Sequence, residues 1–280
     1  MITIAGIKRH SLYSPNHISN DALIFKKTVK KLNESDIMVN VYEEADLDTT
    51  EIKESFIFSM AQGIEGTKKL SELEETGKTI INSPKGSINS YRYNMVEILP
   101  QKGIPFPKSY VVSIDEKDKI KFGDFNTRKI WIKRGDVHAV HREDVTLVYS
   151  EDERKNIFSE FEKRGIKQVV LQQHLDGDVI KFYSVTGSPL FHWYYLNGNN
   201  HTPFSEKELN DLAVKSAKEL GLDIYGGDAV ISADGSISII DINDWPSFAP
   251  IREEAGNQIA NLISQKLITT ESVYNLNFEK

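Results

Sequence analysis

The chain has 280 residues, with 34 Lys and Arg against 41 Asp and Glu, which gives a formal net charge of −7 with His neutral. This length suggests one large domain or two modest ones, and 39% hydrophobic with 27% charged residues is typical of a globular protein rather than a disordered or fibrous one. The absence of cysteine excludes disulfides, thiolate nucleophiles and cysteine-ligated zinc or iron–sulfur clusters.

The charge and the apolar runs also restrict the partners and the location. A net negative charge argues against nonspecific nucleic-acid binding, because that affinity comes from neutralising phosphates. No apolar run approaches the roughly 20 residues that span a bilayer, and the opening MITIAGIKRH lacks the basic and apolar regions of a secretion signal. We therefore expect a cytoplasmic protein with no membrane partner and no nucleic-acid partner.

The first third of the chain alternates between strand and helix patterns. Short β-rich or apolar runs predict strands at residues 1–7, 38–42, 55–60 and 79–81. Apolar residues at helical spacing predict helices over residues 20–32 and 66–75. Strands and helices alternating at this pace favour a small parallel α/β layer. The turn residues Asn82-Ser83-Pro84 end the last strand, so we place the N-terminal α/β domain at residues 1–84.

The remaining residues, 85–280, have a different pattern. A helix over 91–99 is closed by Pro100, and the chain before Pro107 is expected to be extended. Strands are predicted at residues 110–114, 129–133, 145–149, 168–172, 179–185, 189–195, 228–231 and 236–241. Helices are predicted at residues 151–163, 205–220 and 253–266. Antiparallel sheets covered by helices make this part α+β, so the predicted fold class is α/β plus α+β.

The motif with the clearest chemistry lies in the last two predicted strands. Asp234-Gly235 is a strong signal for a tight hairpin between them. The hairpin brings Asp228 close to Asp241 and Asn243, which are two residues apart and therefore share a face. Two carboxylates and one amide oxygen make a site suited to Mg²⁺. The spacing is equally compatible with ordinary polar strand ends beside a turn.

This pattern of an acid on one strand, acid-x-Asn on the next and Pro246 shortly after resembles the metal-binding signature of the ATP-grasp superfamily. The resemblance implies an ATP-grasp fold over residues 85–280, with a lid subdomain at about 108–174, preceded by the small α/β domain. It also implies ATP and Mg²⁺ as cofactors, with two ions expected and Mn²⁺ as an alternative metal. Asp228, Asp241 and Asn243 become the expected metal ligands.

Three basic residues match the superfamily in the same order. Arg92 lies eleven positions before the turn that begins at Gly103, where the ribosomal-protein glutamate ligases usually have Lys; an exposed helix Arg is the alternative. Lys133 ends a strand that resembles the lid strand whose lysine contacts the α- and β-phosphates. Lys181 matches a strand position that holds Arg in the glutamate ligases and Lys in the inositol trisphosphate kinases, which implies contact with the γ-phosphate. Arg92 and Lys181 are the expected catalytic residues.

The lid loop and the hinge complete the expected ATP site. The loop after Lys133 is short and poor in glycine compared with the family's phosphate-covering loop, and Gly135 is expected to approach ATP with its backbone. A strand-to-hinge segment resembles the one that holds adenine, and it comprises Gln172, Gln173, His174 and Leu175. Asp176 or Asp178 is expected at the ribose, although a polar turn around Gly177 explains both equally well.

The residues support phosphoryl transfer by positioning and charge stabilisation. A ligase that resembles the ribosomal-protein glutamate ligases and glutathione synthetase-like enzymes is our first hypothesis: it phosphorylates a small-molecule or peptide carboxylate and then joins it to an amine. A small-molecule kinase resembling inositol polyphosphate kinases and a non-catalytic nucleotide-binding regulatory protein are the alternatives. Candidate substrate residues are His138, His141, Asp244 and Ser247. A homodimer is expected only by analogy with relatives.

Overall fold

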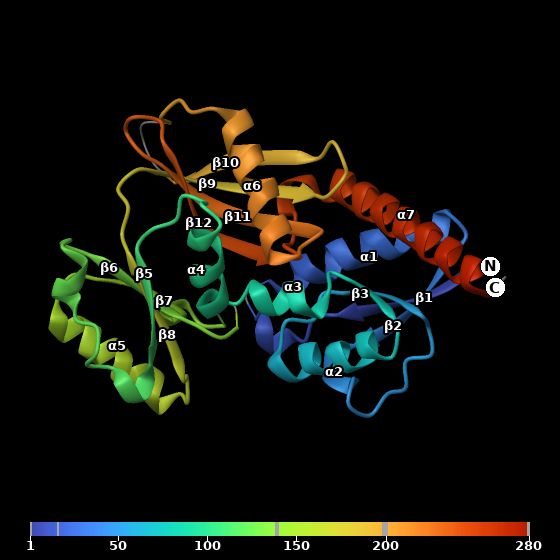
Figure 1. Cartoon of the computed structure of the whole chain (residues 1–280), viewed down its shortest axis with the longest axis horizontal. Helices are drawn as coiled ribbons and strands as arrows, with labels where there is room; N and C mark the ends of the chain where they lie inside the picture. Colours follow the sequence, from blue (N-terminus) through green and yellow to red (C-terminus); the bar gives the residue numbers. More distant parts are fainter. Residues whose placement is uncertain (1, 16, 138–139, 198–200, 279–280) are drawn as a thin grey trace.

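The structure is a computed structural model that describes residues 2–15, 17–137, 140–197 and 201–278. Three four-stranded sheets organise the chain (Figure 1). None of the helices in these described ranges is long and apolar enough to cross a membrane.

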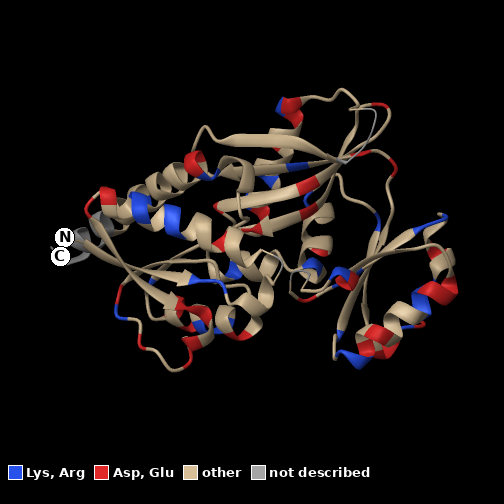
Figure 2. Cartoon of the chain, turned by 180° about the vertical axis from the view of Figure 1, so that it is seen from behind, with Lys and Arg blue, Asp and Glu red and all other residues tan. Residues whose placement is uncertain are grey.

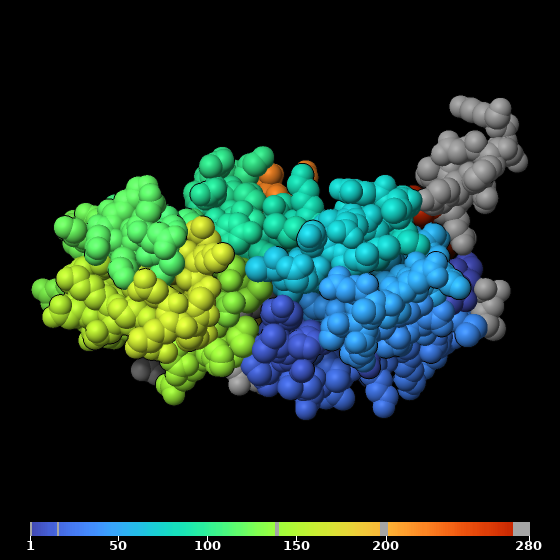
Figure 3. Space-filling view, turned by 90° about the horizontal axis from the view of Figure 1, so that it is seen from below, coloured from blue at the N-terminus to red at the C-terminus, as the bar shows by residue number. Residues whose placement is uncertain are grey.

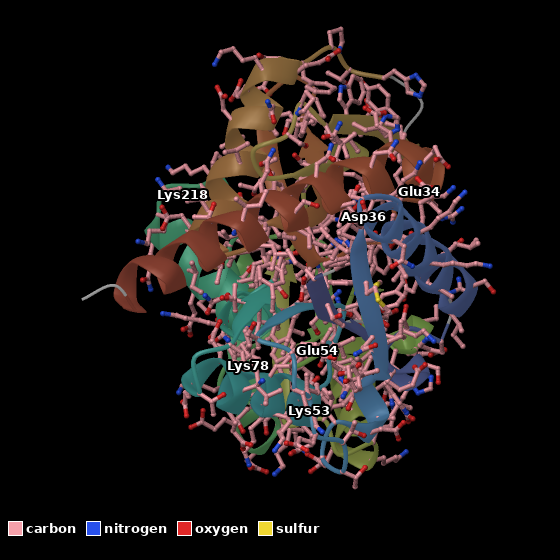
Figure 4. All side chains as sticks on the ribbon, turned by 90° about the vertical axis from the view of Figure 1, so that its right-hand side faces the viewer. Glu34, Asp36, Lys53, Glu54, Lys78 and Lys218 are labelled. Carbon is pink, nitrogen blue, oxygen red and sulfur yellow. The ribbon has the colours of Figure 1, made fainter. Side chains whose placement is uncertain are left out.

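The N-terminal sheet is parallel, as the alternation of strands and helices predicts, with strand order β2-β1-β3-β4. Its strands are β1 (Ile2–Lys8), β2 (Ile37–Glu43), β3 (Phe56–Ser59) and β4 (Thr79–Ile81). They are connected by α1 (Ile18–Glu34) and α2 (Ile64–Glu75). Both helices bury apolar faces, including Ile24 and Leu70. Figure 4 shows this end of the molecule, where α1 runs alongside the C-terminal helix and ends near Glu34 and Asp36.

Two short helices follow the parallel sheet: α3 (Pro84–Asn89), which the sequence patterns did not predict, and α4 (Arg92–Gln101). The Ser83 hydroxyl accepts a hydrogen bond from the Gly86 N–H, and Pro84 occupies the first turn. Ser followed by Pro is a helix-start signal as well as a turn signal. The expected turn is therefore the N-terminus of a helix.

The second sheet, which we call the lid sheet, is antiparallel with order β5-β8-β6-β7. Its strands are β5 (Ser109–Ser113), β6 (Ile130–Arg134), β7 (Val145–Val148) and β8 (Gln168–Gln173), and α5 (Glu151–Lys163) covers one face. Phe158 and Phe161 of α5 are buried against Ile132 and Leu171 of the sheet. Acidic and basic residues occupy the outer face of α5 (Figure 2). This one-sided helix matches the amphipathic pattern of its sequence.

The third sheet, which we call the core sheet, has order β10-β9-β11-β12 and is also antiparallel. Its elements are β9 (Asp178–Val185), β10 (Phe191–Asn197), α6 (Glu206–Leu220), β11 (Ile224–Ile231), β12 (Ile237–Asp244) and α7 (Arg252–Phe278). α6 packs on one face and α7 on part of the other. β11 starts four residues earlier than predicted because Gly226 and Gly227 lie inside the strand. A Cβ on Gly227 would stand 2.5 Å from the Asp241 carbonyl oxygen, so glycine permits the close approach of β12.

The parallel sheet and the core sheet share one hydrophobic core. Phe58 of β3 stacks on Trp245, with ring centroids 5.8 Å apart, and Ile24 of α1 joins the same cluster as Ile263 of α7. The lid sheet has its own core. In the space-filling view of Figure 3 the lid residues and the N-terminal residues form neighbouring lobes. The shared hydrophobic core fixes the position of the core sheet relative to the N-terminal sheet.

Candidate active site

Three of the expected residues lie abreast across the core sheet. Asp228 on β11 is paired in register with Lys181 on β9 and with Asp241 on β12. The Lys181 Nζ is 2.6 Å from the Asp228 Oδ1. A bulge at Ile240 gives β12 one extra residue at this point, so that Asp241 rather than Ile240 stands opposite Asp228. The bulge thus places two carboxylates side by side.

Asn243 adds an amide oxygen to the same face, because it is two residues beyond Asp241 on β12. It is partly exposed and stands opposite Gly226, which has no side chain to cover it. Among the described residues, no group of three or more His, Cys, Asp or Glu side chains could hold a metal ion. Two carboxylates and an amide are nevertheless a suitable partial set for Mg²⁺, which commonly keeps waters and substrate phosphates as its other ligands.

Arg92 reaches this row from the first residue of α4. Its Nη2 is 3.3 Å from the Asp241 Oδ2, and its Nη1 donates to the Arg134 carbonyl oxygen of the lid sheet at 3.4 Å. The side chain is 7% exposed, and its Nε is buried without a hydrogen-bond partner among the described residues. A buried N–H without an acceptor costs about 1–3 kcal/mol. This cost is consistent with a guanidinium placed to receive an anion.

Lys133 comes from β6 of the lid sheet and is 6% exposed. Its Nζ donates to the Gln172 Oε1 at 2.6 Å. Burial lowers the pKa of Lys133 to about 8, a shift that Asp241 opposes, Arg92 reinforces and Asp228 opposes. Arg92 contacts both Asp241 and the carbonyl of Arg134, the residue after Lys133, which places this end of β6 beside the core sheet. Three cations and two carboxylates from five elements therefore meet where the lid and core sheets join.

The Lys181 and Asp228 side chains form an ion pair. Burial lowers the pKa of Lys181, but the Asp228 carboxylate more than offsets this, and the net shift is upward. Burial raises the pKa of Asp228, and Lys181 opposes that effect. We assign the pair as ionised, because the Lys181 Nζ and the Asp228 Oδ1 are within ion-pair distance, at 2.6 Å.

The lowered pKa of Lys133 predicts a pH dependence of nucleotide binding. Above pH about 8 the free protein holds a neutral amine, and binding a triphosphate requires it to take up a proton. Affinity for Mg·AMP-PNP should therefore weaken as pH rises past 8, by up to about tenfold per pH unit. Calorimetry on either side of this pH measures the effect. Lys133→Arg keeps its charge throughout and should remove the dependence; an unchanged slope in that variant contradicts the assignment.

The hinge residues occupy the end of β8 and the segment after it. Gln172 is buried between Lys133 and Ser109, whose Oγ accepts from the Gln172 Nε2 at 3.1 Å. The Gln173 N–H donates to the Lys108 carbonyl at 2.8 Å, and Leu175 is partly exposed. The Trp131 Nε1 donates to the His174 Nδ1 at 3.0 Å.

Two residues expected at ATP are hydrogen-bonded within the protein. The Asp178 Oδ2 is buried and accepts from the N–H and the hydroxyl of Thr202, at 2.7 and 2.8 Å, so it holds the chain that precedes α6. The Gly135 N–H donates to the Gln168 carbonyl at 2.8 Å, which ties the lid loop to β8. A Cβ at Gly135 would lie 2.8 Å from the same oxygen. Glycine is needed at this position because a side chain would prevent the close approach to β8.

The structure describes three of the four candidate substrate residues. His138 falls outside the described residues, and His141 is exposed, with its N–H donating to the Asp144 Oδ2 at 3.0 Å. Ser247 is partly exposed in the turn after β12. Asp244 is fully buried and accepts hydrogen bonds from Asn82 and Ser87. It is one residue beyond Asn243 and therefore lies on the opposite face of the strand.

A second group of residues, which the sequence patterns did not predict, holds the turn after β12. The Arg9 Nη2 donates to the carbonyls of Asp244 and Trp245, at 3.3 and 2.9 Å, while its Nη1 pairs with Asp21 at 2.8 Å. The Gln62 Nε2 donates to the Asp244 carbonyl at 2.8 Å. Arg9 also lines a cavity of about 360 Å³ near the C-terminal ends of β1 and β2. The only signal for this group in the sequence is a basic residue, Arg9, directly after a predicted strand.

The parallel layer followed by two antiparallel sheets, with a lid lysine near acids of the core sheet, defines the ATP-grasp fold. Comparison with solved structures confirms this expectation. D-alanine-D-alanine ligase from Coxiella burnetii matches with a TM-score of 0.73 and 14% identity over 100% of each chain. The RimK domain ATP-grasp protein from Sphaerobacter thermophilus matches with a TM-score of 0.68 and 15% identity, over 93% of this chain and 99% of that one.

D-cycloserine synthetase DcsG also matches, with a TM-score of 0.70 and 13% identity over 95% of this chain and 99% of that chain. No protein-family model matches the sequence, and no curated protein sequence does. Identities this low demonstrate a shared fold. The reaction must therefore be argued from the residues of this chain.

Proposed function

We propose that this protein is an ATP-dependent ligase that joins a carboxylate to an amine. The observation that carries the proposal is the meeting of Arg92, Lys133 and Lys181 with Asp228 and Asp241 at the junction of the lid and core sheets. A triphosphate is the substrate group that needs three cations and a metal site at one place. The similar solved structures include a ligase and a synthetase.

In the first step, a carboxylate oxygen of the acceptor attacks the γ-phosphorus of ATP. The bond between this phosphorus and the β–γ bridging oxygen breaks, which gives an acyl phosphate and ADP. The amine then attacks the acyl carbon, and phosphate leaves with the proton lost by nitrogen. Lys133 neutralises α- and β-phosphate oxygens, while Lys181 and Arg92 neutralise the transferring group. The protein supplies position and charge, and no protein nucleophile is required.

Asp228, Asp241 and Asn243 would hold Mg²⁺. The bound ion supplies charge stabilisation at the β- and γ-phosphate oxygens. Two ions, with Mn²⁺ as a substitute, remain our expectation, as do a cytoplasmic location and a homodimer. The segment from Gln172 to Leu175 would contact adenine, largely through backbone groups. Neither Asp178 nor the Gly135 N–H is part of this proposal, because each is already bonded within the protein.

Two measurements test the proposed function. Calorimetry with Mg·AMP-PNP should show binding by the wild-type protein and a loss of at least tenfold in Lys133→Ala, because a buried charge contact to phosphate is removed. ADP release should then require both a carboxylate and an amine. Binding without ADP release would instead indicate a regulatory protein, and a stable phosphorylated product formed without an amine would indicate a kinase. Absence of nucleotide binding in the wild type overturns all three.

A further inference from the structure

The aromatic run on β10 divides between the two faces of the core sheet. Phe191, Trp193 and Tyr195 pack into the cluster beneath α6. His192 and Tyr194 point the other way, because neighbouring residues on a strand alternate between faces. In the register of β9 and β10, Tyr194 stands opposite Lys181. The row of Asp241, Asp228 and Lys181 thus continues onto Tyr194.

A second polar row lies one step along the same strands. His192 stands opposite Tyr183, which is two residues beyond Lys181 on β9. The hydroxyls of Tyr183 and Tyr194 are 3.3 Å apart, so a hydrogen bond joins the two rows. Burial raises the pKa of Tyr183, and the positive charge of Arg252 opposes the shift. Tyr183 also packs in one cluster with Ala255 of α7, which lies one helical turn beyond Arg252, so Arg252 is on the stretch of α7 that borders Tyr183.

Arg252 has donors that the described part of the chain does not use. Its Nη2 donates to the Asn20 Oδ1 of α1, but its Nε is buried and has no hydrogen-bond partner among those residues. Among the described residues, no carboxylate forms an ion pair with Arg252. A partly buried guanidinium is normally matched by a carboxylate or phosphate, whose geometry fits its planar donors. The fold therefore holds, beside Tyr183, a cation whose donors the described residues do not fully use.

We propose that Arg252, Tyr183 and Tyr194 form a subsite that anchors a second carboxylate of the acceptor. This inference rests on the proposed function, which places the reacting carboxylate at Lys181. Two residues along a strand span about 7 Å, and a short carbon chain with a carboxylate at each end covers that distance. The acceptor is therefore a small dicarboxylate or an amino dicarboxylate. One tyrosine hydroxyl donates to the other, and the second O–H donates to the anchored carboxylate, while His192 borders it.

Calorimetry on the wild-type protein already loaded with Mg·AMP-PNP tests the subsite. The probes are glutarate, L-glutamate and butyrate. Butyrate is glutarate without one of its two carboxylates. At least one of the dicarboxylates should bind about tenfold or more tightly than butyrate, because a charge-assisted contact is made only by the second carboxylate. Equal affinities, or no binding of either dicarboxylate by the nucleotide-loaded protein, overturn the inference.

Variants separate this subsite from the nucleotide site. Arg252→Ala should weaken dicarboxylate binding by about tenfold or more, with affinity for Mg·AMP-PNP unchanged. Tyr194→Phe should weaken it less, and Arg252→Lys should retain part of it. Arg128→Ala, an exposed arginine on the lid, is the matched control. Unchanged dicarboxylate binding in both Arg252 variants contradicts the subsite. Loss of Mg·AMP-PNP binding by the wild type would count against the proposed function itself.

Discussion

Replacing Asp241 with Asn should reduce ATP turnover by about a thousandfold, because a metal ion contributes several kcal/mol of transition-state stabilisation and 1.36 kcal/mol corresponds to a factor of ten. Asn has nearly the shape of Asp, so the pairing of β11 with β12 is expected to persist. The change removes a negative charge beside Asp228 and Arg92. ADP release at saturating ATP, measured over a range of Mg²⁺ concentrations, shows the effect.

The Mg²⁺ dependence distinguishes a metal ligand from a merely structural residue. In Asp241→Asn, higher Mg²⁺ should restore part of the activity, because a weakened ligand raises the concentration needed to fill the site. Asp211→Asn is the matched control, since this exposed carboxylate on α6 pairs only with Lys207 in the described structure. It should leave turnover unchanged. Full activity in Asp241→Asn would refute the metal assignment.

The sequence predicts the central feature of the site because that feature is local. Asp234-Gly235 specifies a hairpin, and the hairpin places Asp228 opposite Asp241. The same alternation separates Asp244 from Asn243, so the face of Asp244 could have been predicted too. Its hydrogen bonds to Asn82 and Ser87 could not, since they join segments more than 150 residues apart. Local patterns determine strand faces, while distant contacts depend on how the sheets pack.

The lid and α4 show the same limit. Lys133 could be placed at the end of a strand from its sequence context, and the structure has it on β6. Gln172 binds the Lys133 ammonium because β6 pairs with β8. Arg92 contacts both the Arg134 carbonyl and Asp241 because of the way α4 packs between the sheets. Neither contact can be read from a local sequence pattern. Arg252 is a stronger example. Its unused donor emerges only when α1, α7 and β9 are packed together.

Asn82→Ala should destabilise the protein by about 3–5 kcal/mol, because several buried polar groups lose their partners at about 1–3 kcal/mol each. The Asn82 side chain is 1% exposed and makes four hydrogen bonds. It donates to the Ile224 carbonyl at 2.7 Å and to the Asp244 carboxylate at 2.5 Å. It accepts from the N–H groups of Asp223 and Ile224, each at 2.8 Å. One side chain thus joins the beginning of β11 to the end of β12.

Urea unfolding measures the loss as a lower midpoint with an unchanged slope. Asn89→Ala is the matched control, because its partly exposed amide makes one hydrogen bond, to the Leu220 carbonyl at 3.0 Å, and should cost about 1 kcal/mol. Equal losses in the two variants would contradict a special role for Asn82. Because β11 carries Asp228 and β12 carries Asp241, the same substitution should also weaken Mg·AMP-PNP binding under conditions where the protein remains folded. Stability and nucleotide binding are therefore expected to fall together at Asn82 and to separate at Asp241.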